Sequence, residues 1–208
     1  MIQKLKTALS EQTLPGDDAH LMLSSMKRVA ANKTPDLSLY RTSAVLILLY
    51  KKDREWHNVL IQRPKYEGKH SNQIAFPGGK KEEGDDSTEV TALREAQEEI
   101  GIHIDKTEII GKLSRLTIPV SLHVVHPYVA IYHGTEDDFE ADQHEVDGII
   151  TYPIKEILTP NCITKAPVEI YKQTQSTVPC FIIQDKIVWG ATSMMLNELR
   201  LLLLELKS

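Results

Sequence analysis

Residues 94–102 limit most strongly which folds this chain can adopt. They place one arginine and three glutamates within about two helical turns, followed by a glycine at residue 101. Glu95, Glu98 and Glu99 are spaced i, i+3 and i+4, so a helix would project all three from nearly the same side. Like charges at this spacing repel each other, and a hard divalent cation bound between their oxygens would reverse that balance. The pattern therefore indicates either a metal site or a solvated acidic face, with Gly101 placed to end the helix in a left-handed conformation.

The residues before this segment predict where its helix starts. Residues 76–80, Phe-Pro-Gly-Gly-Lys, suggest a sharp turn after an apolar approach, and an acidic loop follows at residues 82–86. Asp86 suits an N-cap, and Glu89 three residues later fits a capping box. We therefore expect a helix over about residues 87–99.

The segment from residue 78 to residue 102 resembles the Nudix box, a pattern of a glycine, a spaced acidic residue and then Arg-Glu-apolar-x-Glu-Glu-x-Gly-apolar. Its second half matches at every defined position. Its first half departs from the pattern, since Asp86 replaces a glutamate and Gly79 lies one residue further from it than usual. The resemblance implies the Nudix fold, an α/β/α sandwich built on a mixed sheet, in which the helix of the box lies against one face.

A second resemblance narrows the family. Residues 59–64, His70 and residues 74–79 are similar to the segment that coenzyme A-directed Nudix pyrophosphatases carry before the box. Residues 91–99 and the lengthened first half of the box also look like that subgroup. Three positions depart from the similar segment: Glu67, Gly68 and Asn72.

Composition suits one soluble domain spanning residues 1–208. The net charge of −5 disfavours a general nucleic-acid binder, which usually carries a basic surface, but it leaves room for a phosphate substrate held by a metal. Cys162 and Cys180 lack metal-site spacing and are expected to be isolated thiols of a reducing compartment. With no signal peptide and no membrane-length apolar run, we expect a cytoplasmic protein.

Apolar periodicity predicts a mixed α/β chain that begins with a helical N-terminal extension over residues 1–40. Within this extension, residues 20–31 have helical periodicity. The expected strands cover residues 43–50, 59–62, 109–116, 124–132, 149–153, 181–184 and 187–189. Residues 51–57 read as a polar turn and residues 160–180 as loop with one strand. A brief helix is expected over residues 154–158, and an amphipathic helix over residues 192–206 closes the chain.

The resemblance and the carboxylate chemistry together suggest roles for the acidic residues. We predict that Glu95 and Glu99 bind metal directly, with Glu98 as a further ligand or proton acceptor, and that Arg94 orients a carboxylate. Nudix enzymes often recruit an acidic group from a later loop, for which Glu145 is the first choice. The alternatives for that role are Glu140 and Asp142, and a solvated loop carboxylate is an open reading for each.

Groups around the glycine turn are predicted to contact the substrate. Arg63 suits a phosphate because its planar fork can donate two hydrogen bonds. His70 is a candidate phosphate contact at the same turn, and a surface histidine is the alternative reading. The remaining predicted contacts of the turn are Gly78, Gly79 and Lys80, with Lys69 and Lys81 as solvated neighbours. His123 and His126 flank a strand without a metal-site partner at suitable spacing.

Three functions fit the sequence. The first is a Mg²⁺- or Mn²⁺-dependent pyrophosphatase that cleaves coenzyme A or its derivatives to 4′-phosphopantetheine and adenosine 3′,5′-bisphosphate. The second keeps the reaction but acts on ADP-ribose or a dinucleotide. The third is a Nudix-like nucleotide-binding regulatory domain without turnover, which the intact glutamates Glu95, Glu98 and Glu99 disfavour. A small nucleotide is the expected partner, and a homodimer is possible.

Overall fold

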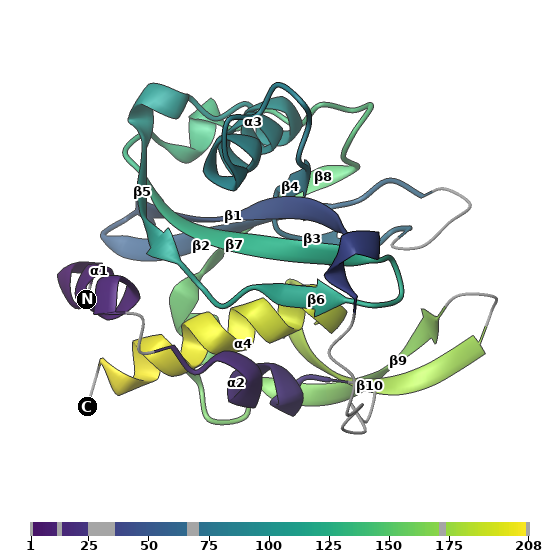
Figure 1. The fold of residues 1–208 in the computed structure, drawn as a ribbon. Coiled ribbons are helices and arrows are strands. Elements are labelled where there is room, and N and C mark those ends of the chain that lie inside the picture. The colour runs from purple at the N-terminus through teal and green to yellow at the C-terminus, as the bar shows by residue number, and fades with distance from the viewer. Residues whose placement is uncertain (1, 12–13, 25–35, 66–70, 171–173, 207–208) are drawn as a thin grey trace.

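A mixed eight-stranded sheet forms the centre of the protein (Figure 1). The computed structural model describes residues 2–11, 14–24, 36–65, 71–170 and 174–206. Five strands follow the order β3-β2-β1-β7-β5, while β4 pairs with β1, β6 with β7 and β8 with β2. Their bounds are Arg41–Lys52 (β1), Glu55–Gln62 (β2), Ile74–Ala75 (β3), Gly78–Lys80 (β4), Thr107–Lys112 (β5), Leu116–Ile118 (β6), His123–Tyr132 (β7) and Gly148–Pro153 (β8).

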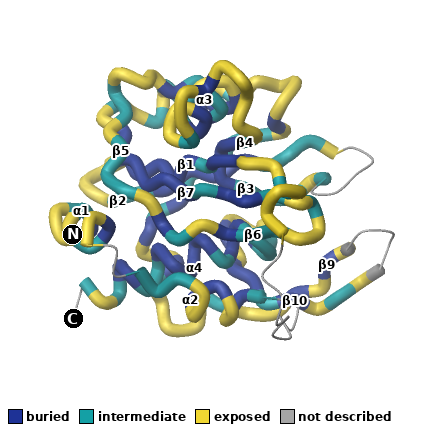
Figure 2. Tube along the Cα trace, viewed as in Figure 1, coloured by how far each residue is buried: buried dark blue, intermediate teal, exposed yellow. Residues whose placement is uncertain are grey.

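The two central strands, β1 and β7, pair in parallel from Arg41 to Tyr50 of β1, and the other pairings in this sheet are antiparallel. Strand β1 is buried on both faces, so its apolar residues run almost without interruption, as expected for a central strand. Ala44, Leu46 and Leu48 belong to one core, whereas Ile47 and Leu49 belong to the other. This alternation shows that a single strand contributes side chains to two apolar layers. Figure 2 shows that most of β1 is buried.

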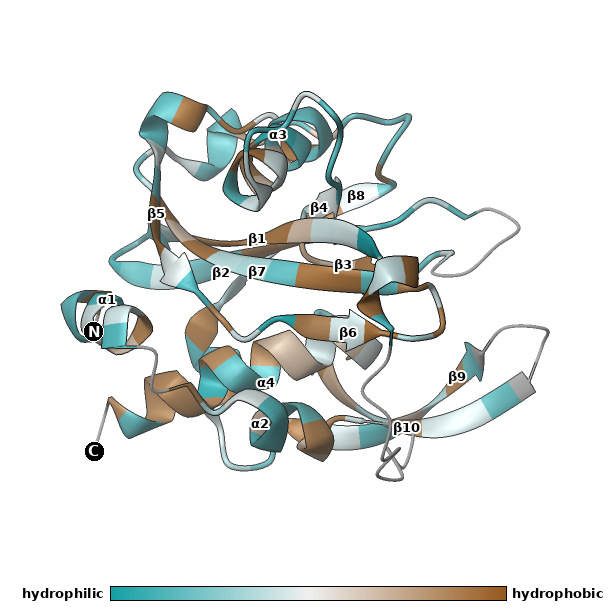
Figure 3. Ribbon diagram, in the orientation of Figure 1, coloured by the Kyte–Doolittle hydropathy of each residue, from teal (hydrophilic) through white to brown (hydrophobic). Residues whose placement is uncertain are grey.

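Helices cover both faces of the sheet. Helix α3 (Thr88–Ile100) packs on one face through Ala92, Ala96 and Ile100. Helix α4 (Gly190–Glu205), with α1 (Ile2–Glu11) and α2 (Gly16–Met22), covers the opposite face (Figures 1 and 3). The predicted α/β/α architecture with N- and C-terminal helices is therefore confirmed.

A second, three-stranded sheet lies on the α4 side. It has the order β11-β10-β9, with β9 over Ile163–Ile170, β10 over Thr174–Ile183 and β11 over Lys186–Trp189. The prediction of one strand in residues 160–180 was therefore wrong, because two long strands pair there. Pro167 weakened the strand pattern, but β9 is an edge strand, and proline is tolerated at sheet edges.

Several predicted boundaries also differ from the structure. The turn expected over residues 51–57 contracts to Asp53 and Arg54, both at positive φ, because β1 and β2 extend to meet them. The segment expected over 109–116 divides into β5 and β6. Helix α2 ends at Met22, while residues 25–31 of the predicted helix 20–31 lie outside the described residues. The described residues also form short 3₁₀ helices at Leu37–Leu39, Ile104–Lys106, Glu136–Asp138 and Ile154–Leu158, the last at the site of the predicted brief helix.

The predictions for the two cysteines and for the last helix are confirmed. Cys162 and Cys180 are free thiols. Helix α4 closes the chain and buries Leu202 and Leu203 of its leucine run. Among the described residues, none of the helices combines the length and apolar character needed to span a membrane.

A buried polar pair fixes the N-terminal helix α2 to α4. Glu198 is fully buried, and its Oε2 lies 2.9 Å from Nε2 of His20, which is also fully buried. The other carboxylate oxygen accepts the backbone N–H groups of Gly16 and Ser114 at 3.2 and 3.1 Å. One side chain therefore joins α2, α4 and the loop after β5.

We predict that Glu198→Ala lowers the free energy of unfolding by about 3–5 kcal/mol, because it leaves the buried His20 and two backbone N–H groups without their acceptor. Urea denaturation measures the change. Glu205→Ala on the exposed end of the same helix is the control and should change stability by less than about 0.5 kcal/mol. Equal stability of the two variants would contradict the anchoring role of Glu198.

Candidate active site

Two adjacent glycines set the distance between α3 and the sheet. Gly78 has φ of +146°, and a Cβ there would overlap the Ala44 carbonyl and the Val45 backbone. Glycine is therefore required both by its conformation and by the close approach of β1. The turn predicted over residues 76–80 is instead partly strand β4, in which Gly78 pairs with Val45 and Gly79 with Ala44.

The same glycines receive the carboxylates of α3. The Gly78 N–H donates to Glu99 Oε2 at 2.7 Å. A Cβ at Gly79 would overlap the carboxylate of Glu95, so this side chain lies directly against the backbone of Gly79. Glu95 and Glu99 are thus fixed in the contact between β4 and α3, one turn apart on the helix.

Glu99 is only 4% exposed. The pKa of its carboxyl group is raised to about 8, mainly by burial and also by the charges of Glu95 and Glu145. The Gly78 hydrogen bond and the Arg63 charge act in the opposite direction and lower this pKa. Burial also raises the pKa of Glu95, while Arg94 opposes that shift. Both carboxylates would therefore gain from a cation placed between them.

Arg94 holds the acidic ridge, by which we mean Glu95, Glu98 and Glu99. Its Nε and Nη2 donate to the two carboxylate oxygens of Asp85 at 3.0 and 3.1 Å. It also donates to Glu95 at 3.0 Å and to Glu98 at 2.8 Å. The predicted pairing of Arg94 with a carboxylate is present, and it links two members of the ridge to the preceding loop.

Asp85 is the residue that the sequence did not identify. It is 4% exposed, accepts from Thr91 Oγ1 at 2.9 Å, and has a pKa held far below its usual value, mainly by the Arg94 hydrogen bonds. The predicted N-cap Asp86 is exposed instead, because Ser87 caps α3 by accepting from the Val90 N–H. The acidic pair before the helix was the available signal, but the resemblance drew attention to Asp86, whereas Asp85 makes the contacts to Arg94.

The helix ends as predicted. Gly101 adopts the left-handed conformation at φ +70° and donates to the Gln97 carbonyl. The loop that follows β7 then covers this end, since the N–H groups of Glu140 and Asp142 donate to the carbonyls of Ile100 and Glu99.

That loop brings Glu145 to the ridge. Glu145 is exposed, and its charge raises the pKa values of both Glu95 and Glu99. Glu140 and Asp142 contribute backbone contacts to α3. Glu98 differs from its neighbours because its side chain is 47% exposed on the outer side of the helix.

Only some of the residues predicted to contact phosphate lie near the acidic ridge. The Arg63 Nε is buried without a hydrogen-bond partner, and the Arg63 charge acts on Glu99. Lys80 is exposed, and its carbonyl accepts from Arg94. Lys81 donates to the carbonyl of Asp85. His70 and Lys69 lie outside the described residues.

The carboxylate oxygens of the candidate active site are chemically suited to bind a hard divalent cation. Carboxylate oxygens are the ligands that Mg²⁺ prefers, and the ridge supplies them beside an orphaned guanidinium nitrogen suited to a phosphate. In the described part of the chain, no group of three or more His, Cys, Asp or Glu side chains is already arranged as a metal cage. Arg94 itself pairs with Glu95 and Glu98.

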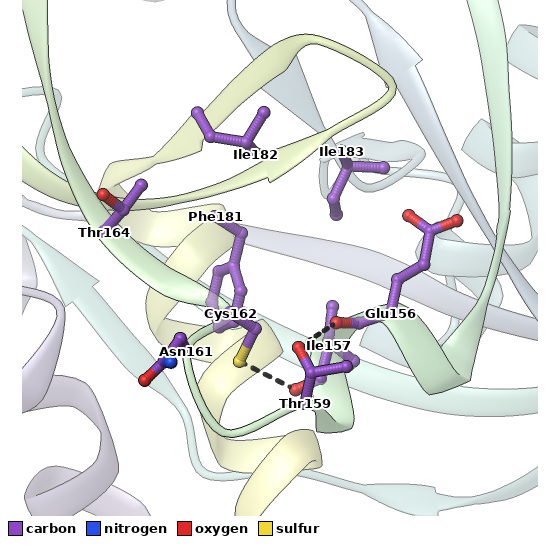
Figure 4. Close-up of a pocket in the computed structure, with 9 residues that line it drawn as sticks. All are labelled: Glu156, Ile157, Thr159, Asn161, Cys162, Thr164, Phe181, Ile182 and Ile183. Carbon is purple, nitrogen blue, oxygen red and sulfur yellow. Dashed lines mark hydrogen bonds between the residues drawn. The ribbon is translucent and has the colours of Figure 1, made fainter.

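A pocket of about 380 Å³ lies elsewhere in the protein, on the α4 side (Figure 4). Its lining includes Ile157, Cys162, Phe181 and Ile183, which belong to the core on that side or pack against it. The acidic ridge lies on the opposite side of the central sheet. This pocket is therefore separate from the candidate active site.

Comparison with known proteins identifies the family. The NUDIX domain matches residues 40–173, and the chain belongs to this family. A protein of Citrobacter koseri described as an uncharacterized Nudix hydrolase NudL is 34% identical over 168 residues, which cover 77% of this chain and 82% of that protein. A protein of Escherichia fergusonii with the same description is 32% identical over 169 residues, with 78% and 82% covered.

A solved structure agrees with the fold. The MutT/nudix family protein from Enterococcus faecalis superposes with a TM-score of 0.52 at 15% identity, covering 98% of this chain and 74% of that one. The family match and these relatives make the chain a hydrolase of the Nudix pyrophosphatase class.

We predict that Gly79→Ala lowers diphosphate hydrolysis at least tenfold, equivalent to about 1.4 kcal/mol in the barrier, because its methyl group displaces Glu95. Gly84→Ala is the control, since a Cβ there meets nothing within 4 Å. Steady-state turnover with Mg²⁺, beside the melting temperature, measures the effect. Wild-type turnover in a folded Gly79→Ala enzyme would show that Glu95 need not lie against β4.

We also predict that the metal-free protein loses stability as pH rises between 4.5 and about 8, because Glu99 binds its proton more tightly when folded than when unfolded. The stabilising contribution of Glu99 is complete below 4.5 and is lost as pH approaches the raised pKa. Urea denaturation of wild type and Glu99→Gln across this range isolates the effect. Parallel pH profiles for the two proteins would contradict it.

Proposed function

We propose that this Nudix pyrophosphatase uses Mg²⁺ or Mn²⁺ to hydrolyse the diphosphate bond of coenzyme A or its derivatives. The products would be 4′-phosphopantetheine, acylated where the substrate is, and adenosine 3′,5′-bisphosphate. One observation carries the hydrolytic part of the proposal: the buried Glu99 carboxylate accepts from Gly78, and the negative charges of Glu95 and Glu145 act on it. Such a concentration of negative charge at low exposure is stabilised best by a divalent cation.

The reaction needs positive charge near a shielded phosphorus. A bound divalent cation neutralises phosphate oxygens and acidifies water. The chain itself would supply the oxygen ligands through Glu95 and Glu99, with Glu98 as a further ligand or proton acceptor. Arg94 would fix Glu95 through its ion pairs, and Asp85 would fix Arg94 in turn.

Glu145 is our candidate for accepting a proton from the attacking water. It projects from a loop rather than from α3, and its charge raises the pKa values of the buried Glu99 and the partly buried Glu95. An exposed carboxylate at this position can reach water on the open side of the ridge. Water would then add to one phosphorus while the bond from that phosphorus to the bridging oxygen breaks.

Among diphosphate substrates, we favour coenzyme A because of the residues in and around strands β2 to β4. Residues 59–64 and 74–79 resemble the segment of coenzyme A-directed enzymes, and they build strands β2 to β4 beside the ridge. The orphaned Arg63 nitrogen near Glu99 suits a substrate phosphate. The alternatives are a pyrophosphatase for ADP-ribose or dinucleotides, and a nucleotide-binding domain without turnover.

We predict that Glu99→Gln lowers kcat by at least a hundredfold while the fold is kept, because an amide can still accept from Gly78 but binds a cation poorly. Glu89→Gln, on an exposed position of the same helix, is the matched control. Turnover at saturating Mg²⁺ and circular dichroism are measured on both. A Glu99→Gln enzyme with wild-type kcat would refute the ligand assignment.

A turnover screen with Mg²⁺ separates the three functions. Coenzyme A, ADP-ribose and NADH are compared by kcat/KM, and coenzyme A should be cleaved fastest. Much faster cleavage of ADP-ribose would show that ADP-ribose, and not coenzyme A, is the preferred substrate. No turnover of any of the three compounds would favour a nucleotide-binding domain without catalysis.

A further inference from the structure

Three basic side chains gather on the α3 side of the sheet, away from the glycine pair. Lys112 ends β5 opposite Tyr128 of β7, and His126 lies two residues before Tyr128, on the same face of that strand. Arg115 follows in the loop to β6, which begins opposite Val125. We call Lys112, Arg115 and His126 the basic cluster.

No acidic side chain in the described part of the chain pairs with the basic cluster. His126 is partly buried, and burial together with the charges of Lys112 and Arg115 lowers the pKa of its imidazole. No hydrogen bond or ion pair joins these three side chains to any residue that the structure describes. Elsewhere lysines near carboxylates are paired, as in Lys6 with Glu108 and Lys106 with Asp138. The cluster therefore carries uncompensated positive charge on a protein whose net charge is −5.

Sheet register fixes the distance from the cluster to the acidic ridge. Gly79 and His126 both pair with Ala44 of β1, from opposite sides. At the usual spacing of neighbouring strands, they lie about 10 Å apart. Because Glu95 rests on Gly79, the ridge and the cluster are separated by roughly the same distance.

Helix α3 gives an independent measure of the same separation. Thr88, at the start of α3, shares a hydrogen bond of 2.7 Å with Tyr128, the residue opposite Lys112. Glu95 lies seven residues further along, which corresponds to about 10 Å of helix. The helix therefore runs from beside the basic cluster to the acidic ridge.

We propose that the basic cluster binds a second phosphate of the substrate, a phosphomonoester separate from the diphosphate that is cleaved. Arg115 can donate a planar fork to such a phosphate, Lys112 adds a point charge, and neutral His126 can donate one ring N–H. The phosphate would relieve the repulsion between the cations. This subsite depends on the function proposed above, and it assigns the substrate to nucleoside diphosphate derivatives with a phosphorylated ribose.

The subsite would also select between substrates. A ribose that carries a diphosphate on one carbon and a phosphomonoester on another can place the two groups over the ridge and over the cluster. ADP-ribose and NADH lack that phosphomonoester, so they would leave Lys112 and Arg115 unpaired. Coenzyme A carries it, and dephospho-coenzyme A is the otherwise identical compound without it.

Calorimetric binding of two nucleotides tests the subsite without any turnover. Wild-type protein should bind adenosine 3′,5′-bisphosphate at least tenfold more tightly than adenosine 5′-monophosphate. The double variant Lys112→Ala/Arg115→Ala should lose this preference by weakening only the bisphosphate. The control Lys165→Ala/Lys186→Ala removes the same charge from exposed positions on the three-stranded sheet and should keep the preference. Equal affinity of wild type for both nucleotides, or equal losses in both double variants, would overturn the subsite.

Steady-state kinetics separate the subsite from the proposed function. In the Lys112→Ala/Arg115→Ala enzyme, KM for coenzyme A should rise at least tenfold toward that for dephospho-coenzyme A, with kcat unchanged. An enzyme that cleaves coenzyme A and keeps its preference in this variant would refute the subsite alone. An enzyme that cleaves no coenzyme A would refute the proposed function, while the calorimetric comparison would still decide whether the cluster binds the second phosphate.

Discussion

The bidentate ion pair between Arg94 and Asp85 is the interaction on which the candidate active site depends. Three glutamates on one side of a helix repel each other, and the guanidinium of Arg94 lies between two of them. Asp85 fixes that guanidinium in place from a buried position in the preceding loop. The acidic ridge is therefore ordered by a charge pair within the protein, and its buried member, Glu99, keeps carboxylate oxygens for a cation.

The central sheet provides the second constraint. Ala44 on β1 is fully buried and pairs with Gly79 on one side and His126 on the other. This one register fixes the glycine contact of the ridge, and also the position of the basic cluster. The proposed reaction site and the proposed second phosphate site are thus held by the same rigid strands, which suits a substrate with two anionic groups at a set distance.

The sequence predicted the features that depend on local patterns. The helix of the box, its left-handed glycine stop and the central strands follow from periodicity and from the conformational freedom of Gly101. Asp85 could not be separated from Asp86 by sequence alone, because the distinction depends on which of them faces Arg94 after folding. The basic cluster was missed for the same reason: its three members come from β5, a loop and β7, and only strand register brings them together.

The most direct test of the central claim is Mn²⁺ binding followed by electron paramagnetic resonance, since this signal reports the metal without requiring a substrate. Wild-type protein should quench the signal of free Mn²⁺ in a saturable manner. The double variant Glu95→Gln/Glu99→Gln should leave the signal of free Mn²⁺ intact while its circular dichroism stays native. Equal binding of Mn²⁺ by both proteins would contradict the account, because the metal would then be held by groups other than the acidic ridge.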